Sequence, residues 1–161
     1  MKIGVPTEPE GETRVAIVPT SMKKLLKAGF EVVVENGAGV AANYSDKEYT
    51  ESGATIADRG VVMKCDIIIS IRLPDISELS KGQIVACVSD PFRHPDRIKA
   101  CIDGGITLMS MDMIPRRLSR AQSMDVNSSQ DNLAGYKAVL LGASQVPRGI
   151  PMMTTSAGTV R

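Results

Sequence analysis

The sequence predicts an α/β fold in which helices flank a doubly wound, mostly parallel β-sheet. Short apolar or β-branched runs alternate along the chain with segments that carry helix caps and helical spacing. One run, Asp66–Ile71 (DIIISI), is nearly continuous in apolar residues, as a strand buried on both faces of a sheet requires. Such alternation indicates right-handed crossovers between parallel strands.

The N-terminal half of the chain supplies three strands and the segments that connect them. Thr20 or Ser21 can cap a helix, and Gly29 suits the position just after that helix. Ser45 or Asp46 can cap the next one. The expected strands are Lys2–Val5, Glu31–Glu35 and Ala54–Ile56, and the expected helices run from the first cap to Ala28, over Asp46–Ser52 and over Asp58–Lys64.

The C-terminal half continues the alternation and ends in a tail. The segment Gly142–Arg161 contains Pro147 and Pro151 and is expected to be irregular. The order of elements is typical of flavodoxin-like and Rossmann-like domains. The expected strands are Asp66–Ile71, Gln83–Val88 and Ile106–Met109, and the expected helices are Ile76–Leu79, Pro95–Asp103 and Leu133–Leu141.

Composition excludes several classes of function. The 161 residues have room for one domain with a proper core, and 19 basic residues balance 18 acidic ones. With no Trp, two Phe and three Tyr, the chain lacks both the basic field and the stacking side chains that nucleic-acid binding needs. Cys65, Cys87 and Cys101 form no CxxC pair and are expected to be buried, reduced thiols. Neither a signal peptide nor a membrane-spanning stretch is predicted, so a soluble chain is expected.

Ligands of parallel α/β sheets bind beyond the carboxyl ends of the strands, and two arginines are expected there. Arg14 follows the polar loop after the first strand, and Arg72 leaves the central strand; either guanidinium could bind a carboxylate or instead lie on the surface. His94 is the only histidine and has no second metal-ligand type near it, so we expect an exposed loop residue and no metal site.

The least ordinary stretch of the chain is Met113–Tyr136 (MIPRRLSRAQSMDVNSSQDNLAGY). It contains guanidinium groups, amides, hydroxyls and a carboxylate in the middle, Asp125, but few apolar residues. These groups suit a polar, anionic small molecule. The alternative is a solvated loop ahead of a helix, with Asp125 or Ser128 as the N-cap.

Several segments carry a resemblance to a known family. The N-terminus MKIGVPTEPEGETRVAIVP resembles that of alanine dehydrogenases and of the α subunit of proton-translocating NAD(P) transhydrogenase. The segments VVENGAGVAANYSDKEYTESGATI and CDIIISIRLPD continue the likeness. The stretch RLSRAQSMDVNSSQDNLAGYKAV is similar to the transhydrogenase loop that reaches over bound NAD(H), and PMMTTSAGTV is similar to the segment that leads into that family's NAD-binding domain.

The resemblance implies a role for individual residues. It places the catalytic loop residues of the family on Arg117, Gln122 and Asp125, and a further NAD(H)-binding residue on Ser128. These groups would hold the nicotinamide of NAD(H) for hydride transfer to NADP(H) on a partner domain or subunit. Arg14 and Arg72 are the remaining candidates for cofactor binding. A homodimer is implied, cytoplasmic and peripheral to the inner membrane through partner subunits.

Two departures from the related dehydrogenases make alanine dehydrogenase the second choice. Their catalytic lysine falls on Arg72 and their catalytic histidine on Asp90. The resemblance also divides the chain into an N-terminal α/β domain, residues 1–125, and a connecting helix and tail, residues 126–161, which would lead into an absent Rossmann domain. By itself the chain is therefore expected to be inactive and to bind NAD(H) weakly. A non-catalytic α/β module that works by association is the third interpretation.

Overall fold

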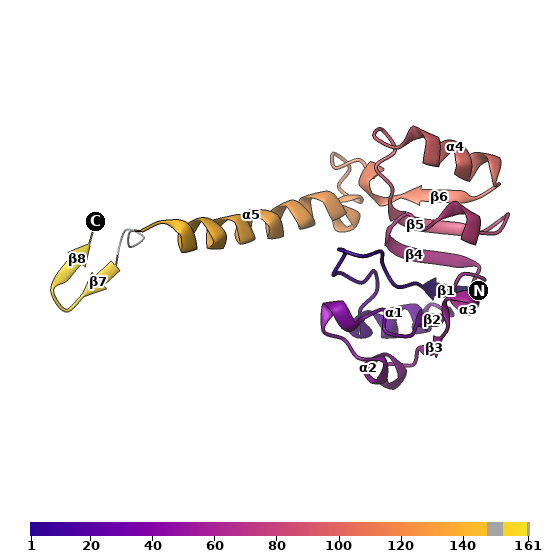
Figure 1. Cartoon of the computed structure of the whole chain (residues 1–161), viewed down its shortest axis with the longest axis horizontal. Helices are drawn as coiled ribbons and strands as arrows, with labels where there is room; N and C mark the ends of the chain where they lie inside the picture. Colours follow the sequence, from indigo (N-terminus) through magenta and orange to yellow (C-terminus); the bar gives the residue numbers. More distant parts are fainter. Residues whose placement is uncertain (148–152, 161) are drawn as a thin grey trace. The chain divides into compact units, whose positions relative to one another are not determined.

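A computed structural model describes residues 1–147 and 153–160 of the chain, and it confirms the predicted α/β class. Six parallel strands form one sheet in the order β3-β2-β1-β4-β5-β6 (Figure 1). The chain builds outward from β1 to β3, then crosses back so that β4 lies on the other side of β1. The strands are β1 Lys2–Val5, β2 Glu31–Glu35, β3 Thr55–Ala57, β4 Ile67–Arg72, β5 Ile84–Val88 and β6 Thr107–Ser110.

The helices and 3-10 turns lie between the strands, as the alternation predicts. The helix α2 shows the expected cap: the Ser45 Oγ accepts the Glu48 N–H (3.3 Å), while the Glu48 carboxylate accepts the Ser45 N–H (2.7 Å). The α-helices are α1 Met22–Lys27, α2 Asp46–Glu51, α3 Arg59–Val62 and α4 Pro95–Asp103, and the 3-10 turns are η1 Pro19–Ser21, η2 Val40–Ala42, η3 Ile76–Glu78 and η4 Met111–Met113.

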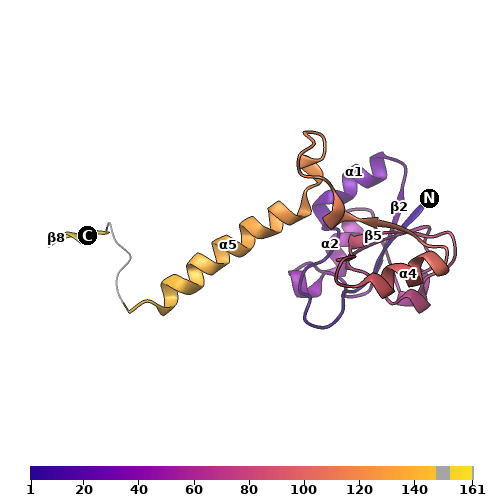
Figure 2. The same ribbon diagram turned by 90° about the horizontal axis from the view of Figure 1, so that it is seen from above.

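Side chains that alternate along the strands feed two hydrophobic cores, one on each face of the sheet. In β2, Val32 and Val34 face the first core, which contains Met22 of α1, and Val33 faces the second, which contains Cys101 of α4. Figure 2 accordingly shows α1 and α4 on opposite sides of the sheet. This double covering explains why β4 had to be apolar on both faces.

Two residues hold neighbouring elements close to the sheet. Gly4 lies in β1, and a Cβ there would overlap the carbonyl oxygen of Val62 in α3. Gln83, only 6% exposed, donates from Nε2 to the carbonyl oxygens of Met63 and Cys65, both at 2.7 Å. The connection between α3 and β4 is thus bonded to the start of β5, although Gln83 is polar.

Residues Arg116–Arg161 form a second compact unit, separate from Met1–Pro115, and here two predictions were wrong. Helix α5 spans Val126–Gln145, instead of Leu133–Leu141, because Asp125 caps an earlier start. The tail is not irregular throughout: an antiparallel hairpin joins β7 Met153–Thr155 to β8 Gly158–Val160. The prolines at 147 and 151 flank α5 and the hairpin, and residues 148–152 lie outside the described residues.

Candidate functional site

The carboxyl ends of β1 and β4 meet where the strand order reverses, and there the structure brings Arg14 and Arg72 together. Glu12 lies between them: its carboxylate accepts bonds from Arg14 Nε (2.7 Å) and Nη2 (2.6 Å) and lies 3.3 Å from Arg72 Nε. The bidentate hydrogen bonds from Arg14 lower the pKa of Glu12 to about 2. The expected pair of arginines is therefore real, but a carboxylate of the chain itself already neutralises part of its charge.

A second glutamate from the same loop ties β1 to β4. The register of β4 against β5 shifts between Ile69 and Arg72, and Glu8 accepts the backbone N–H groups of Ile71 (2.5 Å) and Arg72 (3.0 Å). Burial raises the pKa of Glu8, while these two hydrogen bonds oppose the rise. The position of the Arg72 backbone thus depends on the loop that also carries Arg14.

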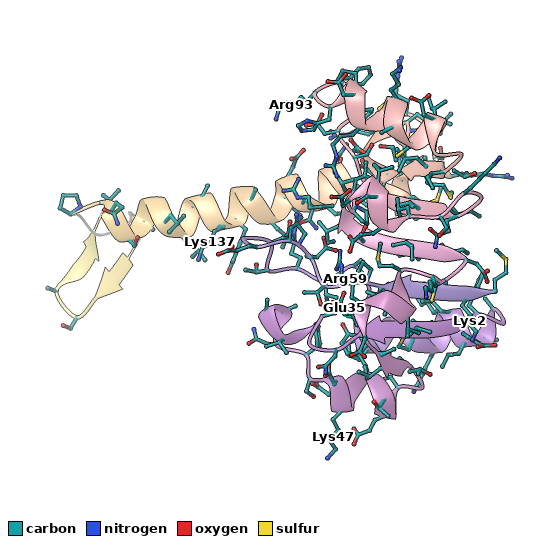
Figure 3. All side chains as sticks on the ribbon, turned by 45° about the vertical axis from the view of Figure 1, so that its right-hand side comes forward. Lys2, Glu35, Lys47, Arg59, Arg93 and Lys137 are labelled. Atoms are coloured by element: carbon teal, nitrogen blue, oxygen red, sulfur yellow. The ribbon has the colours of Figure 1, made fainter. Side chains whose placement is uncertain are left out.

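Beside these groups is a cavity of about 620 Å³. On its β2 side Arg59 binds Glu35 (3.1 Å), Glu78 (2.7 Å) and the Thr7 carbonyl (3.3 Å); Figure 3 shows Arg59 and Glu35 side by side. Hydrogen bonds to Glu78 raise the pKa of Arg59. The sequence analysis missed this network because Arg59 and Glu78 begin or flank helices, and only the fold brings them to the strand ends. The cavity is lined by Pro6, Thr7, Glu8, Pro9, Glu35, Arg59, Ser70, Arg72, Leu73, Pro74, Asp75 and Arg97.

The end of β5 is shaped by a carboxylate from the turn after β6. Asp112 accepts the N–H groups of Ser89 (3.2 Å) and Asp90 (3.0 Å). These bonds accompany a left-handed conformation at Asp90, with φ at 45°. His94 is exposed, as predicted, at the position before α4. The Asp90 backbone is thus anchored rather than free.

The four predicted loop residues lie in the second unit, which we describe by itself, apart from Arg14 and Arg72. Asp125 is the N-cap of α5 and accepts the Ser128 N–H (2.9 Å), which confirms one of the two proposed caps. Hydrogen bonds from Ser128 lower the pKa of Asp125. Gln122 begins the 3-10 turn η5 (Gln122–Met124) and is exposed, as is Arg117.

Other chemistry finds little support in the described residues of the chain. The thiols of Cys65, Cys87 and Cys101 are free and buried, as predicted, and burial raises the pKa of Cys87 to about 12, which suppresses the nucleophilic thiolate. Within residues 1–147 and 153–160 there is no group of three metal-ligand side chains. Over those same residues, none of the helices combines the length and the apolar character needed to cross a bilayer.

Comparison with known proteins places these features in a family. The family model "Alanine dehydrogenase/PNT, N-terminal domain" matches residues 4–134. The first component of a divided NAD(P) transhydrogenase subunit alpha, from Rhodospirillum rubrum, is 42% identical over 99% of this chain and 44% of its own length. An alanine dehydrogenase of Methanococcus maripaludis is 30% identical over 92% of this chain and 40% of its own length.

Solved structures agree with the sequence comparisons. The crystal structure of transhydrogenase from Sinorhizobium meliloti has a TM-score of 0.92 and 41% identity, and the match covers 99% of this chain and 49% of that one. An L-alanine dehydrogenase, with a TM-score of 0.84 and 23% identity, shows the same fold. This chain therefore spans less than half of the length of the relatives cited here. It belongs to the alanine dehydrogenase/PNT family and corresponds to the N-terminal part of transhydrogenase α subunits.

Proposed function

We propose that this chain is part of the NAD(H)-handling component of a proton-translocating NAD(P) transhydrogenase. The observation that carries the proposal is the match over 99% of the chain to a transhydrogenase α subunit, a match that includes the loop with Arg117, Gln122, Asp125 and Ser128. Its task is to position the nicotinamide of NAD(H) for hydride transfer to NADP⁺. Because the hydride passes directly between two rings, orientation and proximity supply the catalysis, and the loop needs no acid or base.

The state of the loop side chains fits this division of roles. The Arg117 side chain makes no hydrogen bond or ion pair with any residue that the structure describes, so its guanidinium can bind an anionic or carbonyl-bearing ligand. The exposed Gln122 amide offers both a donor and an acceptor. Asp125 and Ser128 bond to each other, and their contribution is to fix the helix start that carries the loop. Arg14 and Arg72 are the further cofactor-binding candidates, oriented by Glu12.

We further propose that the chain acts with partners: an NADP(H)-binding domain or subunit, a Rossmann-containing segment and a second copy of itself, with attachment to the inner membrane from the cytoplasmic side through other subunits. The name of the Rhodospirillum rubrum relative, which numbers it as one component of its subunit, supports a multi-part assembly. Helix α5 supports association too, because Leu133, Tyr136 and Leu140 share one helical face and are exposed. The division into residues 1–125 and 126–161 belongs to this proposal.

The experiment is Gln122→Asn in the subunit assembled with its nucleotide-binding partners. The change keeps the amide but withdraws it by one methylene, and a misplacement of about 1 Å costs roughly a hundredfold in rate. We expect hydride transfer from NADH to an NADP⁺ analogue, followed in a single turnover, to slow about tenfold to a hundredfold, with NADH affinity nearly unchanged.

A matched control is Gln145→Asn, the same change on an exposed glutamine at the end of α5. It should leave the rate unaltered. A Gln122→Asn enzyme with normal transfer would contradict the proposal and favour the non-catalytic interpretation.

A further inference from the structure

Two neighbouring arginines at the start of the second unit are in different situations. Arg117 makes no hydrogen bond or ion pair with the residues that the structure describes. Arg116 instead forms two ion pairs, from Nε to Asp125 Oδ2 (3.8 Å) and from Nη2 to Asp131 Oδ2 (3.5 Å). The sequence treats the two as equivalent, and only the fold separates them.

The ion pairs of Arg116 close the loop onto helix α5. Asp125 uses its Oδ1 to accept the Ser128 N–H (2.9 Å), so that Oδ2 remains for Arg116. Asp131 lies further along the same helix. One guanidinium therefore joins the beginning of the segment 116–125 to its end and to the helix that follows.

We infer that Arg116 is a positioning residue for this loop, one that holds the segment 116–125 against the start of α5 so that Arg117 and Gln122 are presented in a fixed arrangement. The inference rests on the function proposed above. Joining the two ends of a flexible segment removes conformations that the loop would otherwise sample. Transfer between two rings depends on orientation, so it should be sensitive to that loss of order.

The first test measures loop order without any cofactor, by amide hydrogen exchange on the full chain. The informative amides are Ala121, bonded to the Leu118 carbonyl (2.8 Å), and Met124, bonded to the Ala121 carbonyl (2.9 Å). Arg116→Gln should speed their exchange about twofold to fivefold, the range that exposed ion pairs produce. High salt should speed exchange in the unaltered chain and narrow this difference.

Three further variants distinguish the ion pairs from a general effect of losing a charge. Asp131→Asn should give part of the Arg116→Gln effect, and the double variant should exchange little faster than Arg116→Gln alone. Arg116→Lys should rescue part of the order, because one ammonium retains the charge but lacks the fork that reaches two carboxylates. Arg93→Gln, at an arginine whose side chain is 83% exposed in the first unit, should change nothing. Unchanged exchange in Arg116→Gln would overturn the inference.

The second test uses the assembled enzyme and separates this inference from the proposed function. Arg116→Gln should lower kcat for hydride transfer about twofold to fivefold and change KM for NADH less, since Arg116 is not assigned to the nucleotide. If Gln122→Asn slows transfer and Arg116→Gln does not, only the role of Arg116 fails. If Gln122→Asn has no effect either, the proposed function fails. A lower rate with unchanged amide exchange would make Arg116 a direct ligand contact, contrary to the inference.

Discussion

Gln83 provides a sharp test of how the first unit is held together, through the replacement Gln83→Met. Methionine has nearly the same length and volume, so packing is kept and only the hydrogen bonds are lost. The side chain is 6% exposed and satisfies the carbonyl oxygens of Met63 and Cys65, each at 2.7 Å. A buried polar group left without its partner costs about 1–3 kcal/mol. Two such carbonyls therefore predict a loss of roughly 2–5 kcal/mol in the free energy of unfolding.

Urea unfolding followed by far-ultraviolet circular dichroism measures this loss, because the chain contains no Trp for a fluorescence assay. The midpoint should fall while the slope with urea stays constant, which indicates a change in stability rather than in the unfolded state. Lys64→Met, an exposed position in the same connection, should leave the midpoint nearly unchanged. A loss below about 1 kcal/mol for Gln83→Met would refute the reasoning and imply that water reaches both carbonyls.

Two further predictions concern backbone contact and charge. Gly4→Ala should cost about 1–3 kcal/mol or more, because its Cβ would overlap the Val62 carbonyl, whereas Gly60→Ala has open space and should be neutral or stabilising in thermal unfolding. Arg14 lowers the pKa of Glu12 from 4.5 to about 2, so this carboxylate stabilises the fold above pH 4.5 and loses that effect as the pH falls toward 2. Glu12→Gln should therefore be less stable than the unaltered chain at pH 7, and urea midpoints at about pH 7 and about pH 3 should show the difference shrinking; an equal difference at both would count against the pairing.

The strands could be predicted because the signal for each is local. The runs at Lys2–Val5 and Glu31–Glu35 have the predicted bounds, and the other four strands of the sheet lie within a residue of theirs. Apolar continuity in β4 and the cap at Ser45 come from interactions within a few residues or from burial that the residue type itself demands. The loop that holds Asp125 was also found from its composition, and the cap at Asp125 was one of two alternatives.

Helix α5 could not be delimited in the same way. Its first two turns, from Val126, consist mainly of Ser, Asn, Gln and Asp, which have no strong helical preference, and the helix extends through Gly142. The cap at Asp125 and the ion pairs of Arg116 decide where it begins. The hairpin of β7 and β8 was missed because each strand has only three residues, and pairing across the turn outweighs so short a signal.

The sequence by itself determined the fold class, the order of strands and helices, and the residue types available at the carboxyl edge. Only the tertiary structure decided which charges meet: Glu12 lies between Arg14 and Arg72, Arg59 bridges Glu35 and Glu78, and Arg116 pairs with two carboxylates of its own unit. The physical reason is that strand and helix signals depend on neighbours along the chain, whereas an ion pair depends on distance in space. At the sheet, that distance is set by how parallel strands bring separate loops to one edge.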